Sequence, residues 1–317
     1  MPTPDSTTDG APLVTATGLT KRFGDFVAVD GIDFEVRPGE VFGLLGPNGA
    51  GKTSTMRMVA CVSPASGGAL RVLGQDPATA GPAIRSRLGV VAQEDNLDTE
   101  LSVFDNFIIY GRYFGMRRSE IAARAEELLD FAQLTDRRDD RVDPLSGGMK
   151  RRRTIARSLI NSPDMVLLDE PTTGLDPQAR QLLWDRLYGL KRQGVTLLLT
   201  THYMDEAEQL CDRLVVMDDG RIVDEGSPRQ LIERHVTDEV VELRFADDAN
   251  QVTATAVATE LGLRHETVAD RILIYADDGN ATRRALVDRG VTAATALTRR
   301  SSLEDVFLAL TGRTLVD

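Results

Sequence analysis

Residues 40–60 read EVFGLLGPNGAGKTSTMRMVA, and the structural class of the chain follows from this segment. An apolar run over residues 41–45 predicts a buried strand, a glycine-rich loop follows it, and the residues from Lys52 onward predict a helix. The loop matches G-x-x-x-x-G-K-[ST], the pattern of phosphate-binding loops, in the strand and helix context that this pattern requires. The residues predicted to bind a nucleotide here are Gly46, Pro47, Asn48, Gly49, Ala50, Gly51, Lys52, Thr53 and Ser54.

The chemistry of a phosphate-binding loop accounts for these residue types. Glycines let backbone N–H groups approach phosphate oxygens, and the N-terminus of the following helix adds a favourable dipole. We expect Lys52 to bridge the β- and γ-phosphates and Thr53 to place its hydroxyl on Mg²⁺. The alternative interpretation is a glycine-rich turn with an exposed lysine.

Two adjacent acids end another apolar segment, MVLLDE, at residues 165–170. The segment predicts a buried strand, and ligands gather at the carboxyl ends of strands in open α/β sheets. We therefore predict that Asp169 binds Mg²⁺, directly or through water, and that Glu170 is the base that polarises the attacking water. An Asp-Glu pair alone is usually a solvated turn, but this pair follows a buried strand in a chain with a phosphate-binding loop.

Further apolar runs predict a parallel α/β sheet. They cover residues 88–91, 165–168, 196–200 and 214–217. Helical stretches fall between several of them, at 119–133 with Ser119 as the N-cap and at 179–193, and this alternation is typical of α/β folds. Residues 215–226 predict a closing hairpin with Asp219 and Gly220 in its turn.

The pattern of strands and helices changes after about residue 235. The remaining segments alternate as β-α-β-β-α-β with a terminal helix, which predicts a small ferredoxin-like α+β domain. A length of 317 residues also favours about two domains. We predict a flexible tail over residues 1–12, a nucleotide-binding domain over 13–236 and an accessory α+β domain over 237–317.

Composition excludes several classes of function. With 37 basic and 49 acidic residues the net charge is −12, which disfavours nonspecific binding to nucleic acid or anionic lipid. We interpret the basic run at residues 150–153 as a solvated helix face. Cys61 and Cys211 lie far apart and the three histidines are scattered, so no metal cluster is predicted and a reducing compartment fits best. No apolar run approaches the ~18–20 residues of a membrane span, so we expect another chain to cross any membrane involved.

Residues 145–149 read LSGGM, between the phosphate-binding loop and the Asp-Glu pair. With the motifs in this order, the chain resembles the nucleotide-binding subunits of ABC transporters, whose signature is LSGGQ. The resemblance implies a P-loop NTPase cassette with a mixed-sheet core, an antiparallel β-subdomain and a helical subdomain. It also implies that the signature contacts ATP held by the loop of a second copy, through a cradle of N–H groups at a helix N-terminus. The signature residues are Leu145, Ser146, Gly147, Gly148 and Met149, of which Met149 replaces the usual glutamine.

The resemblance assigns roles to further residues. Phe23 corresponds to the aromatic residue that stacks on adenine, although it could also be a core phenylalanine of a strand, with Phe26 nearby. Gln93 corresponds to a glutamine that contacts Mg²⁺ or the attacking water and senses the membrane partner.

Two more positions match after the Asp-Glu pair. Asp176 would cross the interface between two copies, the alternative being a solvated turn. His202 would contact the γ-phosphate and orient Glu170. The implied catalytic residues are thus Lys52, Gln93, Glu170 and His202, and the implied Mg²⁺ ligands are Thr53, Gln93 and Asp169.

Three segments also resemble a subgroup, the ABC-2 exporters of drugs or lipid-linked sugars, such as daunorubicin-resistance and nodulation-factor exporters. They are residues 93–115, the string LSGGMKRR and the closing SSLEDVFLALTG. In this family the permease docks between Gln93 and Phe114, so Leu101, Phe104 and Phe107 are docking candidates if exposed. Packing inside the helical subdomain is the alternative for each.

The implied function is ATP hydrolysis for an ABC-2 export system. Two copies would bind two ATP·Mg²⁺ head to tail and drive efflux of a drug or lipid-linked compound through a separate polytopic permease, from the cytoplasmic side of the cell membrane. The alternative is a soluble ABC-type ATPase acting on nucleic acid or ribosomes, but such proteins usually have two cassettes, a coiled-coil insertion or a basic arm. For the C-terminal domain, ligand sensing and assembly support both remain open, and the sequence does not name the cargo.

Overall fold

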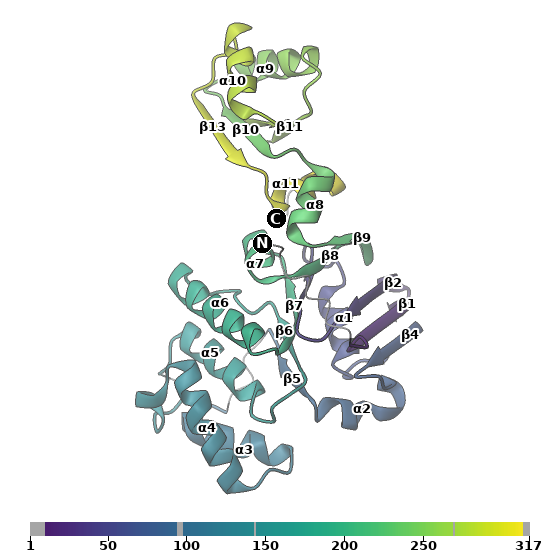
Figure 1. Ribbon diagram of the computed structural model, residues 1–317, viewed down its shortest axis with the longest axis vertical. Helices are drawn as coiled ribbons and strands as arrows, with labels where there is room; N and C mark the ends of the chain where they lie inside the picture. Colours follow the sequence, from purple (N-terminus) through teal and green to yellow (C-terminus); the bar gives the residue numbers. More distant parts are fainter. Residues whose placement is uncertain (1–9, 94–97, 143, 269, 313–317) are drawn as a thin grey trace, which may run out of the picture. The chain divides into compact units, whose positions relative to one another are not determined.

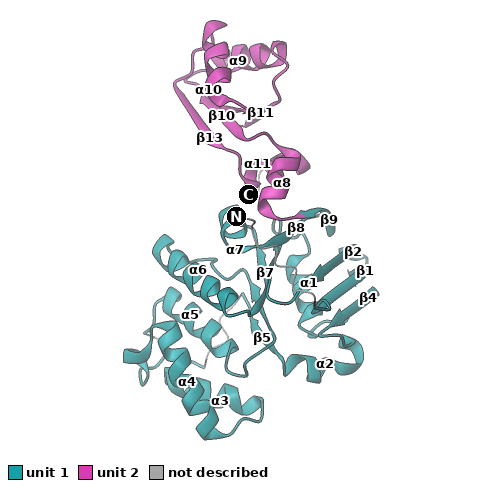
Figure 2. Ribbon diagram, in the orientation of Figure 1, with its two compact units in different colours: residues 1–225 teal, residues 226–317 magenta. Residues whose placement is uncertain are grey.

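A computed structural model describes residues 10–93, 98–142, 144–268 and 270–312. The chain divides into two compact units, the first ending at Glu225 and the second beginning at Gly226 (Figure 2). This division falls before the helix at Pro228–His235, whereas the boundary expected from the sequence lies after it. The limits of the two predicted domains stay a prediction.

A six-stranded sheet forms the centre of the first unit, in the order β5-β6-β7-β3-β8-β9 (Figure 1). Its strands are β3 (Val41–Leu45), β5 (Leu88–Val91), β6 (Met165–Asp169), β7 (Thr196–Thr201), β8 (Arg213–Asp218) and β9 (Arg221–Gly226). Pairing is parallel from β5 to β8, and β3, β6 and β7 are buried along their whole length, as expected for strands covered on both faces. The hairpin turn before β9 has positive φ at both Asp219 (45°) and Gly220 (78°), which confirms the predicted turn.

A three-stranded antiparallel sheet lies in the same unit, in the order β2-β1-β4. Its strands are β1 (Val14–Phe23), β2 (Phe26–Val36) and β4 (Gly67–Val72), and the helices α1 (Lys52–Val59) and α2 (Pro77–Arg85) accompany it. Helix α1 contacts strands of both sheets, and one core spans them, in which Phe34 stacks on Phe42 with 5.9 Å between ring centroids. This core holds the start of α1, and therefore the phosphate-binding loop, in place.

The remaining helices of the first unit form its helical part. They are α3 (Val103–Tyr113), α4 (Arg118–Ala132), the short 3₁₀ helix η1 (Thr135–Arg137), α5 (Gly147–Ser158), α6 (Pro177–Arg192) and α7 (Met204–Leu210). The predicted cap of α4 was wrong, because Arg117 is the N-cap and its N–H donates to the Glu120 side chain over 3.0 Å. Helix α6 begins earlier than predicted, because Asp176 caps it and Pro177 suits the first position of a helix.

The basic run on α5 was expected to be a solvated face, and this is wrong for two of its residues. Arg151 and Arg153 are buried, whereas Lys150 and Arg152 are half-buried. Burial of a guanidinium group requires hydrogen-bond acceptors, and backbone carbonyls supply them here.

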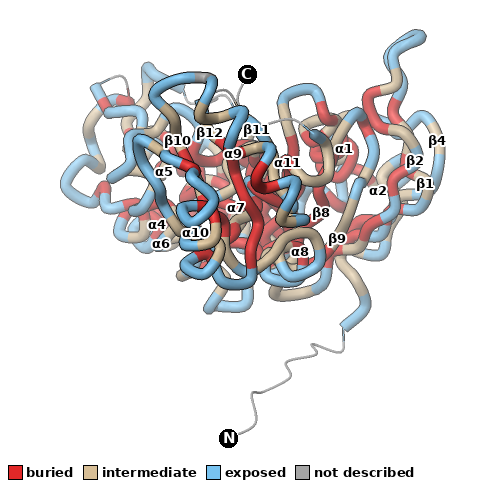
Figure 3. The backbone as a smooth tube through the Cα atoms, turned by 90° about the horizontal axis from the view of Figure 1, so that it is seen from above, coloured by how far each residue is buried: buried red, intermediate tan, exposed pale blue. Residues whose placement is uncertain are grey.

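The second unit confirms the predicted ferredoxin-like topology. Its elements are α8 (Pro228–His235), β10 (Glu239–Arg244), α9 (Asp248–Glu260), β11 (His265–Val268), β12 (Arg271–Ala276), α10 (Gly279–Asp288), β13 (Thr295–Arg300) and α11 (Leu303–Thr311). The sheet is antiparallel throughout, in the order β11-β12-β10-β13. Helices α9 and α10 pack on the strands, α11 contacts α8, and burial concentrates along the central strands (Figure 3). Across the described part of both units, no helix is long and apolar enough to cross a membrane.

Candidate functional site

The phosphate-binding loop runs from the end of β3 to the start of α1. Glycine is required at Gly46, where a Cβ atom would lie 2.2 Å from the Met217 carbonyl oxygen. It is also required at Gly51, where φ is 96° and a Cβ atom would lie 2.4 Å from the Ala28 carbonyl oxygen. Close packing on β2 and β8 therefore accounts for two of the glycines of the motif.

Lys52 lies buried at the first position of α1. Its Nζ donates to the carbonyl oxygens of Gly46 (2.7 Å) and Pro47 (2.9 Å) and lies 3.8 Å from Oε1 of Glu170. Burial lowers the pKa of this ammonium group, while Glu170 and Asp169 oppose the shift. The exposed-lysine interpretation of the motif is therefore wrong.

A pocket of about 240 Å³ opens beside this loop. Phe23, Phe26, Ala28, residues 48–54, Gln93 and Glu170 line it. Phe23 is 54% exposed and Phe26 63% exposed, so Phe23 is not a core residue. The ammonium group of Lys21 lies 4.9 Å from the centre of the Phe23 ring. The two aromatic rings thus offer apolar surface to a flat ligand next to the phosphate-binding loop.

Asp169 ends β6 within reach of two hydroxyl groups. Its Oδ1 accepts hydrogen bonds from Thr200 Oγ1 (2.6 Å) and from Thr53 Oγ1 (3.2 Å). Mg²⁺ prefers oxygen ligands such as carboxylates and hydroxyls. The Thr53 hydroxyl and the Asp169 carboxylate therefore form a donor set that fits Mg²⁺.

Glu170 follows in a left-handed backbone conformation, with φ of 44°. Its N–H donates to both Oγ1 (3.0 Å) and the carbonyl oxygen (3.2 Å) of Thr200, which fixes the turn after β6. A non-glycine residue in this conformation is strained, and such strain is common at functional sites.

Besides Lys52, three side chains contact the Glu170 carboxylate. His202 Nδ1 lies 3.2 Å from Oε1, while Gln93 Nε2 (3.3 Å) and Thr173 Oγ1 (3.1 Å) donate to Oε2. The contact with His202 is the main cause that lowers the pKa of Glu170, and burial acts against it. The structure thus brings Lys52, Gln93, Glu170 and His202 together, although their catalytic roles stay predictions.

The signature residues lie outside the lining of this pocket. Ser146 is exposed at the N-cap of α5, where its Oγ accepts the Met149 N–H over 3.3 Å, and Leu145 is buried beneath it. Gly148 lies against α6, where a Cβ atom would be 2.9 Å from the Ala179 Cβ, whereas Gly147 has open space. Within one chain the signature and the phosphate-binding loop are therefore not brought together.

Asp176 is exposed and accepts the Ala179 N–H over 2.9 Å as the N-cap of α6. This contact accounts for an aspartate at this position within a single chain. The predicted role across an interface stays a prediction.

Two residues near the carboxylates were missed by the sequence reasoning, Thr200 and Arg151. Thr200 is the fifth residue of the segment TLLLTT (residues 196–201), and its place next to the Asp-Glu pair follows from the pairing of Asp169 with Thr200 between β6 and β7. Arg151 donates to the backbone carbonyl oxygens of Asp169, Glu170 and Pro171. Its position in the basic run carried no signal that separates it from its neighbours.

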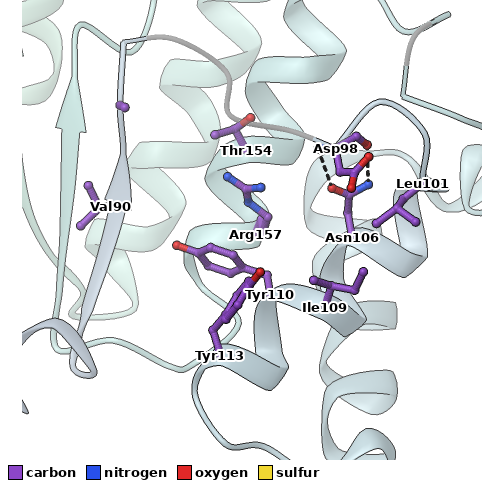
Figure 4. Close-up of a pocket in the computed structure, with 10 residues that line it drawn as sticks. Val90, Asp98, Leu101, Asn106, Ile109, Tyr110, Tyr113, Thr154 and Arg157 are labelled. Carbon is purple, nitrogen blue, oxygen red and sulfur yellow. Dashed lines mark hydrogen bonds between the residues drawn. The ribbon is translucent and has the colours of Figure 1, made fainter. Parts of the chain in front are cut away.

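A second pocket, of about 400 Å³, lies between the end of β5 and the helices α3 and α5 (Figure 4). It is lined by Val90, Ala92, Asp98, Leu101, Asn106, Ile109, Tyr110, Tyr113, Thr154 and Arg157. Asn106 holds the segment before α3 by donating to the Asp98 carbonyl oxygen and accepting the Asp98 N–H. On the other side, the guanidinium group of Arg157 lies 4.5 Å from the centre of the Tyr110 ring. Tyr113 is 80% exposed at its edge.

The three docking candidates have different environments. Leu101 is half-buried and lines the second pocket. Phe104 is half-buried beneath the Arg138 guanidinium group, 4.0 Å from its ring centre. Phe107 is fully buried, so the packing alternative holds for it. Residues 94–97, within the predicted docking segment, lie outside the described residues.

Comparisons with known proteins match both units. A family model described as ABC transporter matches residues 29–173, and one described as the C-terminal domain of the nodulation factor export protein NodI matches residues 250–312. The Nod factor export ATP-binding protein I of Cupriavidus metallidurans is 48% identical over 305 residues, which cover 96% of this chain and 99% of that protein. The solved structure of cbiO1 from Clostridium perfringens, part of an ABC transporter complex, has 25% identity and a TM-score of 0.66 over 80% of this chain and 97% of its own. An ATP-binding cassette of an ABC transporter in its ADP conformation has 26% identity and a TM-score of 0.63 over 71% of this chain and 95% of its own.

Proposed function

From the premise that this chain belongs to the family of ABC transporter ATP-binding subunits and is the ATP-hydrolysing subunit of an exporter, we propose roles for its residues. We also propose the class of compound that it exports. The cargo is a drug or a lipid-linked compound. Relatives of nearly the same length are named for Nod factor export, and their likeness extends through the C-terminal domain. This likeness favours a lipid-linked sugar of the Nod-factor class. No observation favours action on nucleic acid or ribosomes.

The single observation that carries the catalytic proposal is the cluster of Lys52, Gln93, Glu170 and His202. Backbone N–H groups of the loop and the Lys52 ammonium group bind the phosphates of ATP. Glu170 accepts a hydrogen bond from the attacking water, and its lowered pKa keeps it ionised at neutral pH. His202 holds the carboxylate at Oε1, and Gln93 holds it at Oε2.

Thr53, Asp169 and Gln93 are the residues that would hold Mg²⁺. When bound, the metal neutralises charge that develops on the β- and γ-phosphate oxygens. Thr53 and Asp169 already share a hydrogen bond, so little rearrangement of this chain is needed.

Two copies act together, head to tail. Ser146 and Gly147 are exposed at the start of α5, where the N–H groups of a helix N-terminus offer an anion-binding cradle that lies apart from the loop of the same chain. In a head-to-tail dimer this cradle contacts the γ-phosphate of the ATP held by the second copy, and exposed Asp176 crosses the interface.

A polytopic permease is the membrane partner, and it places the subunit at the cytoplasmic side of the cell membrane. The second pocket suits a segment of such a permease, because it presents Leu101, Ile109 and Tyr113 beside Arg157. Ala92 lines this pocket, and the next residue, Gln93, contacts Glu170. Binding of the permease at the pocket would therefore reach the predicted base through Gln93.

The catalytic assignment is tested with two variants and one control. Lys52→Ala should abolish turnover because the phosphates lose their cation. Glu170→Gln should still bind ATP and accumulate as an ATP-bound dimer, because only the base is lost. Glu127→Gln, on an exposed face of α4, is the matched control and should resemble the wild type. Normal ATPase activity in either site variant would disprove the assignment.

The permease assignment is tested by tagging this chain in its own cell and identifying polytopic membrane proteins that co-purify with it. Tyr113→Asp should abolish co-purification, because it places a charge on the apolar edge of the second pocket. Tyr188→Asp is the control, since Tyr188 is 51% exposed on α6 and does not line that pocket. Equal recovery of the permease with both variants would exclude docking at this pocket.

For the second unit, the likeness of its C-terminal segment favours a role in assembly over ligand sensing. A truncation after Glu225 removes the whole second unit, including α8 and the helix α11 that it contacts. The truncated chain should dimerise with ATP less well than the full chain. Unchanged dimerisation, ATPase activity and export after the cut would contradict an assembly role.

A further inference from the structure

Arg151 makes an unusual set of contacts for a residue that is only 5% exposed. Its guanidinium group donates to five backbone carbonyl oxygens. They are those of Pro171 (2.8 Å from Nε), Ala92 (2.6 Å) and Gln93 (3.3 Å) from Nη1, and Asp169 (2.8 Å) and Glu170 (3.0 Å) from Nη2. Only arginine has donors in a planar fork that can reach carbonyls on several sides at once, so lysine could not make this set of bonds.

These carbonyls belong to two segments that carry site residues. One segment follows β5 and ends with Gln93, and the other follows β6 and contains Glu170. The side chains of Gln93 and Glu170 meet at 3.3 Å, and both residues line the pocket beside the phosphate-binding loop. The backbone is therefore held by Arg151, and the side chains project from it toward the pocket beside the phosphate-binding loop.

The helix that carries Arg151 also touches two other sites. Helix α5 starts at the exposed Ser146 cap, and its later residues Thr154 and Arg157 line the second pocket. Figure 4 shows these two side chains on α5, facing the pocket. Arg151 thus lies on α5 between the signature and the second pocket.

We propose that Arg151 is a positioning residue for ATP hydrolysis, which fixes the backbone beneath Gln93 and Glu170 and ties it to the signature helix. This inference rests on the proposed roles of Gln93 and Glu170. Arg151 itself does not line the pocket beside the phosphate-binding loop. Its loss should displace the Glu170 carboxylate while leaving the phosphate-binding loop, and hence ATP affinity, unchanged.

The test compares Arg151→Met and Arg151→Lys with Arg152→Met in the full-length chain. Arg152 is the next residue of the same helix, and its guanidinium group donates to the Gln133 side chain instead (2.8 Å). A displaced catalytic group costs about 100-fold in rate, so we expect kcat of Arg151→Met to fall by about 100-fold with an unchanged dissociation constant for a fluorescent ATP analogue. Arg151→Lys should recover part of the rate, and Arg152→Met should match the wild type.

Two further readouts separate positioning from a general loss of structure. Amide hydrogen exchange should rise in residues 92–93 and 170–173 of the Arg151 variants but not in the phosphate-binding loop. Guanidinium ion added to Arg151→Ala should restore part of kcat. An unchanged kcat would overturn the inference, as would a parallel loss of ATP affinity and kcat that follows the loss of folded protein.

If Arg151→Met does not fold, Arg151→Lys tests the positioning role instead. A lowered kcat with unchanged ATP affinity supports the inference, and an unchanged kcat overturns it. Glu170→Gln is measured alongside the Arg151 variants. Turnover in Glu170→Gln would disprove the proposed catalytic site itself. An inactive Glu170→Gln together with a fully active Arg151→Lys would overturn only the inference about Arg151.

Discussion

Replacing Thr200 by valine removes one hydroxyl group beneath the carboxylates with little change in shape. Thr200 is fully buried, donates to Asp169 over 2.6 Å and accepts the Glu170 N–H, which keeps its bond to the Thr200 carbonyl oxygen. The net loss is therefore one hydrogen bond to a charged group, which lowers the free energy of unfolding of the first unit by about 1.5–3 kcal/mol. For a unit of this size the corresponding fall in Tm is about 3–12 °C.

Thr196→Val is the matched control on the same strand. Thr196 is also buried, but its hydroxyl accepts a neutral backbone N–H, that of Gly39, over 2.8 Å. The expected loss is therefore smaller, about 0.5–1.5 kcal/mol. Urea unfolding followed by tryptophan fluorescence measures both variants, because Trp184 on α6 is the single tryptophan of the chain and reports on the first unit.

The same variant should also affect activity. Thr200 orients a predicted Mg²⁺ ligand, and loss of such a support lowers metal affinity or activity by about 10- to 100-fold. ATPase rates measured over a range of Mg²⁺ concentrations should therefore be impaired in Thr200→Val and normal in Thr196→Val. Equal stability losses in the two variants, with the same Mg²⁺ requirement, would refute this reasoning.

Two further predictions concern charged contacts. His202→Ala removes the main cause that lowers the pKa of Glu170, while Lys52 and Thr173 still lower it and burial still raises it. The pKa should therefore rise, and the acidic limb of the residual ATPase rate should move to higher pH. An unshifted limb would show that His202 does not set this pKa. Asp305→Ala removes the buried carboxylate to which the half-buried Arg299 donates twice (2.7 and 2.8 Å), and the second unit should lose about 1.5–3 kcal/mol in thermal unfolding. Glu304→Ala, an exposed neighbour in the same helical turn, should cost little, and similar losses in both would contradict the assignment.

Much of the fold could be predicted because the central strands are buried on both faces. The limits of β3 and β5 agree with the apolar runs at residues 41–45 and 88–91. The ferredoxin-like unit could also be predicted, since its strands and helices alternate regularly. The order of strands in the central sheet could not, because no residue of β3 indicates that β7 and β8 are its neighbours.

The candidate site was predicted where a motif carries the chemistry and missed where distant segments meet. The phosphate-binding loop and the Asp-Glu pair are local patterns, and the structure brings them together. The acceptors of the Arg151 guanidinium group come from residues 92–93 and 169–171, so its burial depends on tertiary contacts that composition does not reveal. Similarly, the cap of α4 uses the backbone of Arg117 and the side chain of Glu120, so an Arg at the cap position gave no signal.

The place of β3 in its sheet has a consequence for how the protein is made. Strand β3 is synthesised early, but both of its partners, β7 and β8, leave the ribosome only after residue 195. Until then the apolar residues of β3 lack their native strand neighbours. Pairing between strands that are far apart in the sequence is slow, and the unpaired apolar strand can aggregate in the meantime. A nascent chain that stops before β7 should therefore contain the whole phosphate-binding motif and yet fail to bind nucleotide. Nucleotide binding should begin only once the central sheet is complete.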